Sequence, residues 1–205
     1  MARIIKENLR ERILEAAEKR LWYFGIKKTT IDEIASDAAV GKGTVYLYFA
    51  SKEEIAIAIM GKYKAATVEK QAAIADDKAL APLEKLRQML KLPILSAHRT
   101  CEEHPQALEV VVAVKPHLAE RLQPYICRET ELIAEVLEEG KRAGTFDVDD
   151  SAAAARTLKM MTMGFLPPYP CITGAEEIET ALDKIVDMAV KGLGAKQSPG
   201  PNATI

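Results

Sequence analysis

Between residues 42 and 52 the chain gathers side chains suited to binding the backbone and base edges of double-stranded DNA. Lysine and tyrosine reach phosphate oxygens, and threonine reaches a phosphate or a base edge. A leucine pointing into the major groove can contact a thymine methyl group, and a glycine lets two backbones approach closely. The side chains concerned are Lys42, Gly43, Thr44, Tyr46, Leu47, Tyr48 and Lys52.

Most of these side chains belong to one short helix, predicted over residues 43–49. Val45 and Phe49 are one turn apart and should face the core. Leu47 then points the opposite way, and Lys52 stands at the start of the next helix, where free amides also favour a phosphate. Two other interpretations stay open: the tyrosines pack on the preceding helix, and the lysines are ordinary solvated side chains.

Two further helices precede this segment and should position it. Apolar residues recur at helical spacing from Leu9 to Phe24, and Gly25 follows as a helix stop. Thr30 and Glu33 form a capping box that begins a short helix over 31–38. A break at 39–41 separates it from the helix at 43–49, so the pattern predicts a helix-turn-helix with a supporting first helix.

The rest of the chain also reads as helix, with no useful run of alternating apolar and polar residues. Helices are predicted from residue 51, from Pro82, over about 118–143, over 151–166 and over 176–193. Pro93 should kink or end its helix, Pro116 should separate two helices, and Pro124 should strain the early part of 118–143. We therefore predict an all-α fold.

Composition excludes several classes of protein. Hydrophobic residues make up 48% of the 205 residues and charged residues 28%, which is ordinary for a globular chain. Apolar runs are too short to span a bilayer, and the N-terminus lacks the apolar stretch of a secretory signal. Three cysteines at wide spacing do not indicate a disulfide scaffold, so we expect a cytoplasmic protein without membrane partners.

The net charge of -2 conceals an uneven distribution. Residues 1–70 hold 13 Lys and Arg against 10 Asp and Glu, whereas residues 71–205 hold 15 against 20. This asymmetry favours a nucleic-acid-facing N-terminal end, although two solvated surfaces of different composition would give the same numbers.

Three segments in combination carry a family resemblance: Thr29–Ala35, Ala39–Phe49 and Ser51–Ile55. They resemble the N-terminal domain of the TetR (tetracycline repressor) family over about residues 8–56. The resemblance implies a homodimeric transcriptional regulator, usually a repressor, that a small molecule releases from a pseudo-palindromic operator. Carried over by position, the DNA contacts are Thr30, Lys42, Gly43, Thr44, Tyr46, Leu47, Tyr48 and Lys52.

The chain departs from the family pattern at two positions in the turn. Ala39 stands where glycine is frequent, and alanine there costs about 1 kcal/mol if the turn requires a positive φ. Gly41 stands where serine is frequent, so the predicted N-cap lacks a hydroxyl for phosphate. These departures leave open an alternative function, a helical small-molecule-binding or interaction protein that has lost operator binding.

The resemblance also implies a domain organisation. We predict a DNA-binding domain over 1–52, a helical-bundle ligand-binding and dimerisation domain over 53–196, and a disordered tail over 197–205. Helices 151–166 and 176–193 would form the dimer surface. Soft and apolar side chains in the bundle suit an unidentified, largely apolar effector, although each also suits an ordinary core. The candidate pocket residues are Met89, Tyr125, Met160, Met163 and Phe165.

The sequence gives little support for a metal site, a cofactor site or an enzymatic activity. His98, Cys101 and His104 share a helical face at spacings of three, but Pro105 follows and no fourth ligand has a standard spacing. We expect a helix end there and no metal site. The Gly41–Thr44 segment lacks the spacing of a phosphate loop, and no nucleophile motif is present. We therefore predict no catalytic residues, no cofactor and no enzymatic activity.

Overall fold

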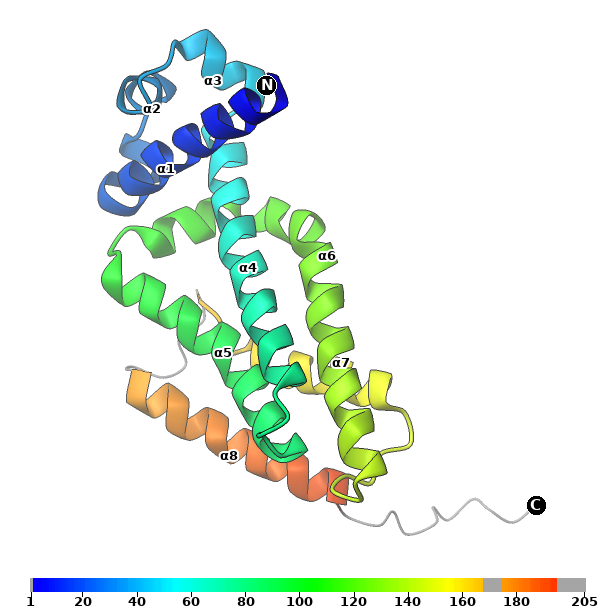
Figure 1. Cartoon of the computed structure of the whole chain (residues 1–205). Helices are drawn as coiled ribbons and strands as arrows, with labels where there is room; N and C mark the ends of the chain where they lie inside the picture. The colour runs from blue at the N-terminus through cyan, green and yellow to red at the C-terminus, as the bar shows by residue number, and fades with distance from the viewer. Residues whose placement is uncertain (1, 168–174, 195–205) are drawn as a thin grey trace, which may run out of the picture. The chain divides into compact units, whose positions relative to one another are not determined.

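The computed structural model describes residues 2–167 and 175–194, and everything regular in these two ranges is helical (Figure 1). The predicted all-α fold is therefore confirmed. The predicted tail over 197–205 lies outside the described residues. The helices are α1 (Ala2–Lys28), α2 (Ile31–Asp37), α3 (Lys42–Tyr48), α4 (Lys52–Asp76), α5 (Pro82–Glu103), α6 (Ala107–Arg142), α7 (Ser151–Met163) and α8 (Ala175–Gly194).

The described residues divide into two compact units. The first unit comprises residues up to 67, residues 96–125 and residue 167, and the second comprises 68–95, 126–166 and 175–194. Three long helices, α4, α5 and α6, contribute to both units. The predicted boundary at residue 52 separates the helix-turn-helix from α4 and remains a prediction.

The core of the first unit forms where the amphipathic faces of α1, α2, α3, α4 and α6 meet. Figure 1 shows α2 and α3 lying beside α1 near the beginning of α4. Trp22 is buried in this cluster. The fully buried members include Ile13, Ala17, Leu21, Ile34, Val45, Ile55, Ala107, Val110 and Val114.

The core of the second unit is built mainly from α5, α6, α7 and α8. Met89 of α5, Leu137 of α6 and Val186 of α8 are fully buried in one cluster. Figure 1 shows α5 and α8 side by side, and ion pairs join them. Arg87 Nη2 lies 2.7 Å from Asp187 Oδ1, and Lys91 Nζ lies 2.9 Å from Asp183 Oδ1.

The prolines of α5 and α6 end neither helix, which corrects the prediction that Pro116 separates two helices. Pro93 does not end its helix, and α6 runs from Ala107 through both Pro116 and Pro124 to Arg142. A proline inside a helix leaves one carbonyl without its amide partner. Pro116 and Pro124 lie on exposed positions, where water can satisfy that carbonyl, so the helix continues past them.

Two local features mark helix ends, a side-chain cap before α7 and a glycine near the end of α1. The Asp150 side chain caps α7 by accepting from the amides of Ala152 and Ala153. Gly25 interrupts the helical backbone near the end of α1 with φ 82°. Within residues 2–167 and 175–194, no helix combines the length and apolar character that crossing a bilayer requires.

Candidate nucleic-acid interface

The helix-turn-helix begins at a complete capping box. Thr30 Oγ1 accepts a hydrogen bond from the Glu33 amide at 3.3 Å, and the Glu33 carboxylate accepts from the Thr30 amide at 2.9 Å. The same carboxylate accepts from the Thr30 hydroxyl at 2.8 Å. The backbone hydrogen bond from Thr30 holds the pKa of Glu33 below its ordinary value. Thr30 therefore acts as the cap of α2, and its exposed side chain remains a proposed phosphate contact.

Helix α3 has one buried face and one exposed face, as its sequence predicts. Val45 is 0% exposed and Phe49 5% exposed, so both belong to the core of the first unit. On the other side, Leu47 is 83% exposed and Tyr46 49% exposed. This exposed face is the one predicted to contact DNA, and its role remains a proposal.

The turn between α2 and α3 has a positive φ at Ala39, the case in which alanine was expected to be costly. Ala39 has φ 51°, the left-handed conformation that favours glycine. Arg12 of α1 supports this turn by donating from Nη2 to the carbonyl oxygen of Ala38 at 2.6 Å. Gly41 is the N-cap of α3 and makes no side-chain capping bond. The turn therefore forms with alanine at this position, at a cost in stability.

The two lysines at the ends of the exposed segment already have partners. Lys42 Nζ lies 2.7 Å from Asp32 Oδ2, and this hydrogen bond raises the pKa of the ammonium group. Lys52 Nζ donates to the carbonyl oxygen of Thr29 at 3.2 Å. Both side chains hold a positive charge on this side of the unit, but Lys42 must leave Asp32 to bind a phosphate with its full charge.

The remaining predicted contacts are distributed along α3. Gly43 is exposed, and a β-carbon built on it would meet nothing within 4 Å, so the backbone there is open to a close approach. Thr44 and Tyr48 are half-buried, and Tyr48 packs against the core of the first unit. Their roles as DNA contacts remain proposals.

The five residues predicted to line an effector pocket do not gather in one place. Met89 is fully buried in the second unit, and Phe165 packs on the small cluster of Ile94, Ile178 and Leu182. Met160 and Met163 are exposed on α7, and Tyr125 lines a cavity in the first unit instead. Periodicity could not separate these cases, because methionine suits a core, a pocket and an interface equally.

The histidine and cysteine cluster lies where α5 ends. His104 follows the last residue of the helix and stacks on Trp22, with ring centroids 5.7 Å apart. Cys101 packs against the core of the first unit, and burial, with a smaller contribution from Glu102, raises the pKa of its thiol. In the described ranges, no three His, Cys, Asp or Glu side chains gather as a metal site would require.

Two basic side chains near the helix-turn-helix escaped the sequence prediction. Arg12 supports the turn, and the Arg10 guanidinium lies over the Phe49 ring, 5.2 Å from its centroid. Both residues project from α1, on exposed positions between the apolar residues of its stripe. Nothing in the local sequence distinguishes them from solvated arginines, because their partners lie 26 and more residues away along the chain.

The N-terminal and the C-terminal parts of the chain each match a known family of protein domains. Residues 13–59 match a family model described as bacterial regulatory proteins, tetR family. Residues 82–186, about half of the chain, match a second model described as the C-terminal domain of tetracyclin repressor-like proteins.

Individual relatives match different lengths of the chain. The uncharacterized HTH-type regulator YhgD of Bacillus subtilis is 56% identical over 43 residues, which span 21% of this chain and 22% of YhgD. The HTH-type transcriptional repressor BepR of Brucella suis is 29% identical over 165 residues, 77% of this chain and 78% of BepR. The Thermus thermophilus FadR structure, a repressor in complex with lauroyl-CoA, superposes with a TM-score of 0.62 at 22% identity, covering 94% of this chain and 99% of FadR. A likeness at that identity establishes the fold alone.

Proposed function

Because this chain belongs to the TetR family of bacterial regulatory proteins, we propose that it is a DNA-binding transcriptional regulator, and not an enzyme. The observation that carries the proposal is the exposed face of α3. Its polar and apolar side chains, Tyr46 and Leu47 above all, point away from a core held by Val45 and Phe49. A helix of this kind fits the major groove, where its N-terminal residues contact bases and its lysines contact phosphates.

The protein works as a homodimer in this proposal, with α7 and α8 forming the contact between two copies. Four methionines leave large apolar surfaces open on these two helices, with Met160 72% and Met188 70% exposed. Apolar side chains gathered on two helices are typical of a subunit contact. Two copies would present two α3 helices to a pseudo-palindromic operator whose half-sites lie about 34–36 Å apart.

In this proposal the regulator acts as a repressor that a small, largely apolar effector releases from its operator. BepR is a repressor by name, and Thermus FadR binds lauroyl-CoA. In the second unit, Gln71 offers a polar group to such a molecule. Its Nε2 donates to the Met89 carbonyl at 2.8 Å, while its buried Oε1 meets no donor among the described residues. An effector with one N–H or O–H group would satisfy that oxygen.

The alternative function, a helical ligand-binding protein without operator binding, rests on Ala39 and Gly41. The turn nevertheless adopts the conformation that α3 requires, with Ala39 at φ 51° and Arg12 bonded to Ala38. Gly41 caps α3 with its backbone alone. This geometry favours DNA binding over the alternative.

The test is binding to labelled duplexes from the region upstream of the gene, measured at several salt concentrations. The expected result is a specific complex with one duplex, whose affinity falls steeply with salt because lysine–phosphate contacts release counterions. Equal affinity for every duplex of the same length, or no complex at low salt, would contradict the proposal. Size measurement of the free protein at the same concentration tests the dimer separately.

A further inference from the structure

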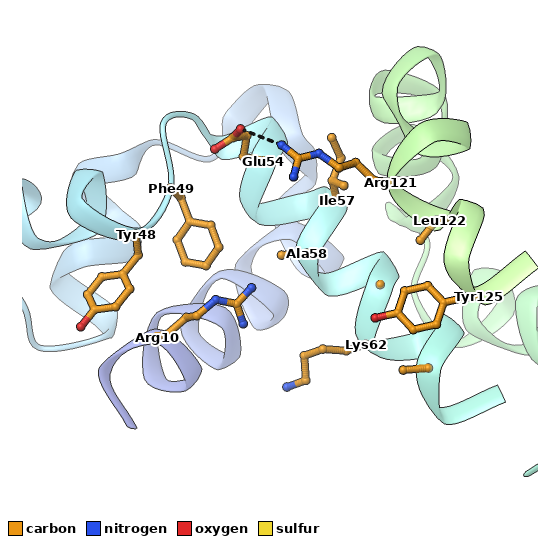
Figure 2. A pocket seen from close by; sticks show the side chains of 12 residues that line it. Arg10, Tyr48, Phe49, Glu54, Ile57, Ala58, Lys62, Arg121, Leu122 and Tyr125 are labelled. Atoms are coloured by element: carbon orange, nitrogen blue, oxygen red, sulfur yellow. Dashed lines mark hydrogen bonds and ion pairs between the residues drawn. The ribbon is translucent and has the colours of Figure 1, made fainter. Parts of the chain in front are cut away.

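A cavity of about 430 Å³ lies within the first unit, against the end of α3 (Figure 2). Its walls come from α1, the end of α3, one stripe of α4 and the segment of α6 at residues 121–125. The volume lies in the range of small-molecule pockets. Figure 2 shows Arg10 and Phe49 on one side of the α4 stripe, and Arg121 and Tyr125 of α6 on the other.

The floor of the cavity contains a glycine that the fold does not explain. Gly61 lies in the middle of α4, where glycine costs about 0.5–1 kcal/mol relative to alanine. It has no positive φ, and a β-carbon built on it would meet nothing within 4 Å. Neither backbone conformation nor close packing therefore requires glycine here. Ala58 and Ala65, one turn away on either side, keep the same stripe small.

The charged side chains around the cavity are mainly basic. Arg10, Lys62 and Arg121 line it, with Glu54 as the one carboxylate among its lining residues, and Lys62 is already paired with Glu11 of α1. Arg121 Nη2 lies 3.4 Å from Glu54 Oε1, a long contact between side chains that are 63% and 40% exposed. Such a pair contributes little to stability. Glu54 also accepts from the Ala50 amide at 2.9 Å, so it is held by the cap of α4 while Arg121 can turn to another anion.

We propose that this cavity binds a small aromatic carboxylate. The guanidinium groups of Arg10 and Arg121 match a carboxylate, whose charge they can neutralise with paired hydrogen bonds. The ring of Tyr125 suits a planar apolar body above the open floor at Gly61, beside the buried Phe49 ring that Arg10 covers. The site is separate from the effector site proposed for the second unit, because all its lining residues belong to the first unit.

Occupancy of the cavity would weaken DNA binding, an effect that rests on the proposed function. Tyr48 and Phe49 line the cavity and also end α3, so a ligand there contacts the proposed DNA-reading helix directly. The ligand brings a negative charge next to Arg10 and Lys62, on the unit that must approach the phosphates. Ligand and DNA then oppose one another, and each lowers the affinity of the other by the same factor.

The site is tested first without DNA, by calorimetric titration of the full chain with 2-naphthoate and with its neutral analogue 2-naphthamide. Naphthoate should bind with one molecule per chain and at least about tenfold more tightly than the amide, because the amide cannot form the charged hydrogen bonds. Gly61→Leu fills the cavity and should lower the affinity for naphthoate at least about tenfold. Ala66→Leu places the same side chain on an exposed position of α4 outside the cavity and should leave binding unchanged.

Equal binding of acid and amide, or equal loss with Gly61→Leu and Ala66→Leu, would overturn the proposal. Circular dichroism of both variants confirms that α4 is intact before they are compared. The titration is then repeated in the presence of the operator duplex, where naphthoate affinity should fall. Naphthoate binding that DNA leaves unchanged would overturn the regulatory effect. Failure of the duplex to bind at all, with naphthoate still bound, would contradict the proposed function and support the site.

Discussion

The guanidinium of Arg12 donates a 2.6 Å hydrogen bond to the carbonyl oxygen of Ala38, one residue before the strained Ala39. The bond joins α1 to the end of α2 and satisfies a carbonyl that the helix leaves without a partner. The position of α3 relative to α1 depends on this turn, because only residues 38–41 separate α2 from α3.

Ala39→Gly should stabilise the protein. A left-handed conformation costs alanine about 1–2 kcal/mol, and glycine avoids this cost. Glycine has more conformational freedom in the unfolded chain, which offsets about 0.5–1 kcal/mol of the gain in stability. We expect a net gain of about 0.5–1 kcal/mol in the free energy of urea unfolding. Ala66→Gly, on an exposed helical position of α4, is the control and should lower stability by a similar amount. A loss of stability with both variants would show that the turn gains nothing from glycine.

Asp32→Asn should increase affinity for DNA. It releases Lys42 from the 2.7 Å ion pair and removes a negative charge beside the exposed face of α3. One additional lysine–phosphate contact should tighten binding about two- to fivefold at low salt and steepen the salt dependence. Asp37→Asn removes a carboxylate from the same helix, but its partner is Arg20, so it should have a smaller effect. Fluorescence anisotropy with a labelled duplex measures both, and equal effects would rule out a specific role for Lys42.

Gly140→Ala should destabilise the second unit. A β-carbon at this position would lie 2.2 Å from Cδ2 of Phe146, whose ring is buried in the core. Relieving that overlap requires the ring to move, at a cost of about 1–3 kcal/mol. Gly192→Ala in α8 meets nothing within 4 Å and should be neutral or slightly stabilising. Thermal unfolding followed by circular dichroism compares the two, and equal midpoints would contradict the packing.

Tyr63 should make stability fall between pH 10 and pH 12. Burial, with a contribution from the hydrogen bond to Glu18, raises the pKa of Tyr63 from 10.0 to about 12. The unfolded chain therefore loses this proton at a lower pH than the folded chain. The contribution is present in full below pH 10 and is lost as the pH rises through the folded value. Tyr63→Phe should flatten that part of the pH profile, whereas Tyr23→Phe, on an exposed ring, should leave it unchanged.

Local patterns predicted the helix-turn-helix well because each signal acts over a few residues. Thr30 and Glu33 are three apart and form their capping box, and the spacing of Val45 and Phe49 assigns the buried face of α3. The strain at Ala39 could be predicted only on the assumption that the turn requires a positive φ there. The conformation of the turn, and not the residue type, sets this φ.

Long-range features could not be predicted in the same way. Pro116 indicated a break, but its exposure, which depends on the whole unit, lets α6 continue. The five candidate pocket residues were chosen by type, and only packing distinguishes the buried Met89 from the exposed Met160. The cavity at Gly61 combines residues from four helices, so no single segment carries its signature.

The central claim is that the exposed face of α3 reads DNA, and one comparison of variants tests it most directly. Tyr46→Ala combined with Lys52→Ala removes two proposed contacts, while Tyr23→Ala removes an exposed tyrosine from α1. Anisotropy titration of a labelled upstream duplex should show at least about a hundredfold loss for the double variant and no change for Tyr23→Ala, with helicity equal in both. Unchanged affinity of the double variant, with its helices intact, would contradict the assignment of α3 as the DNA-binding helix.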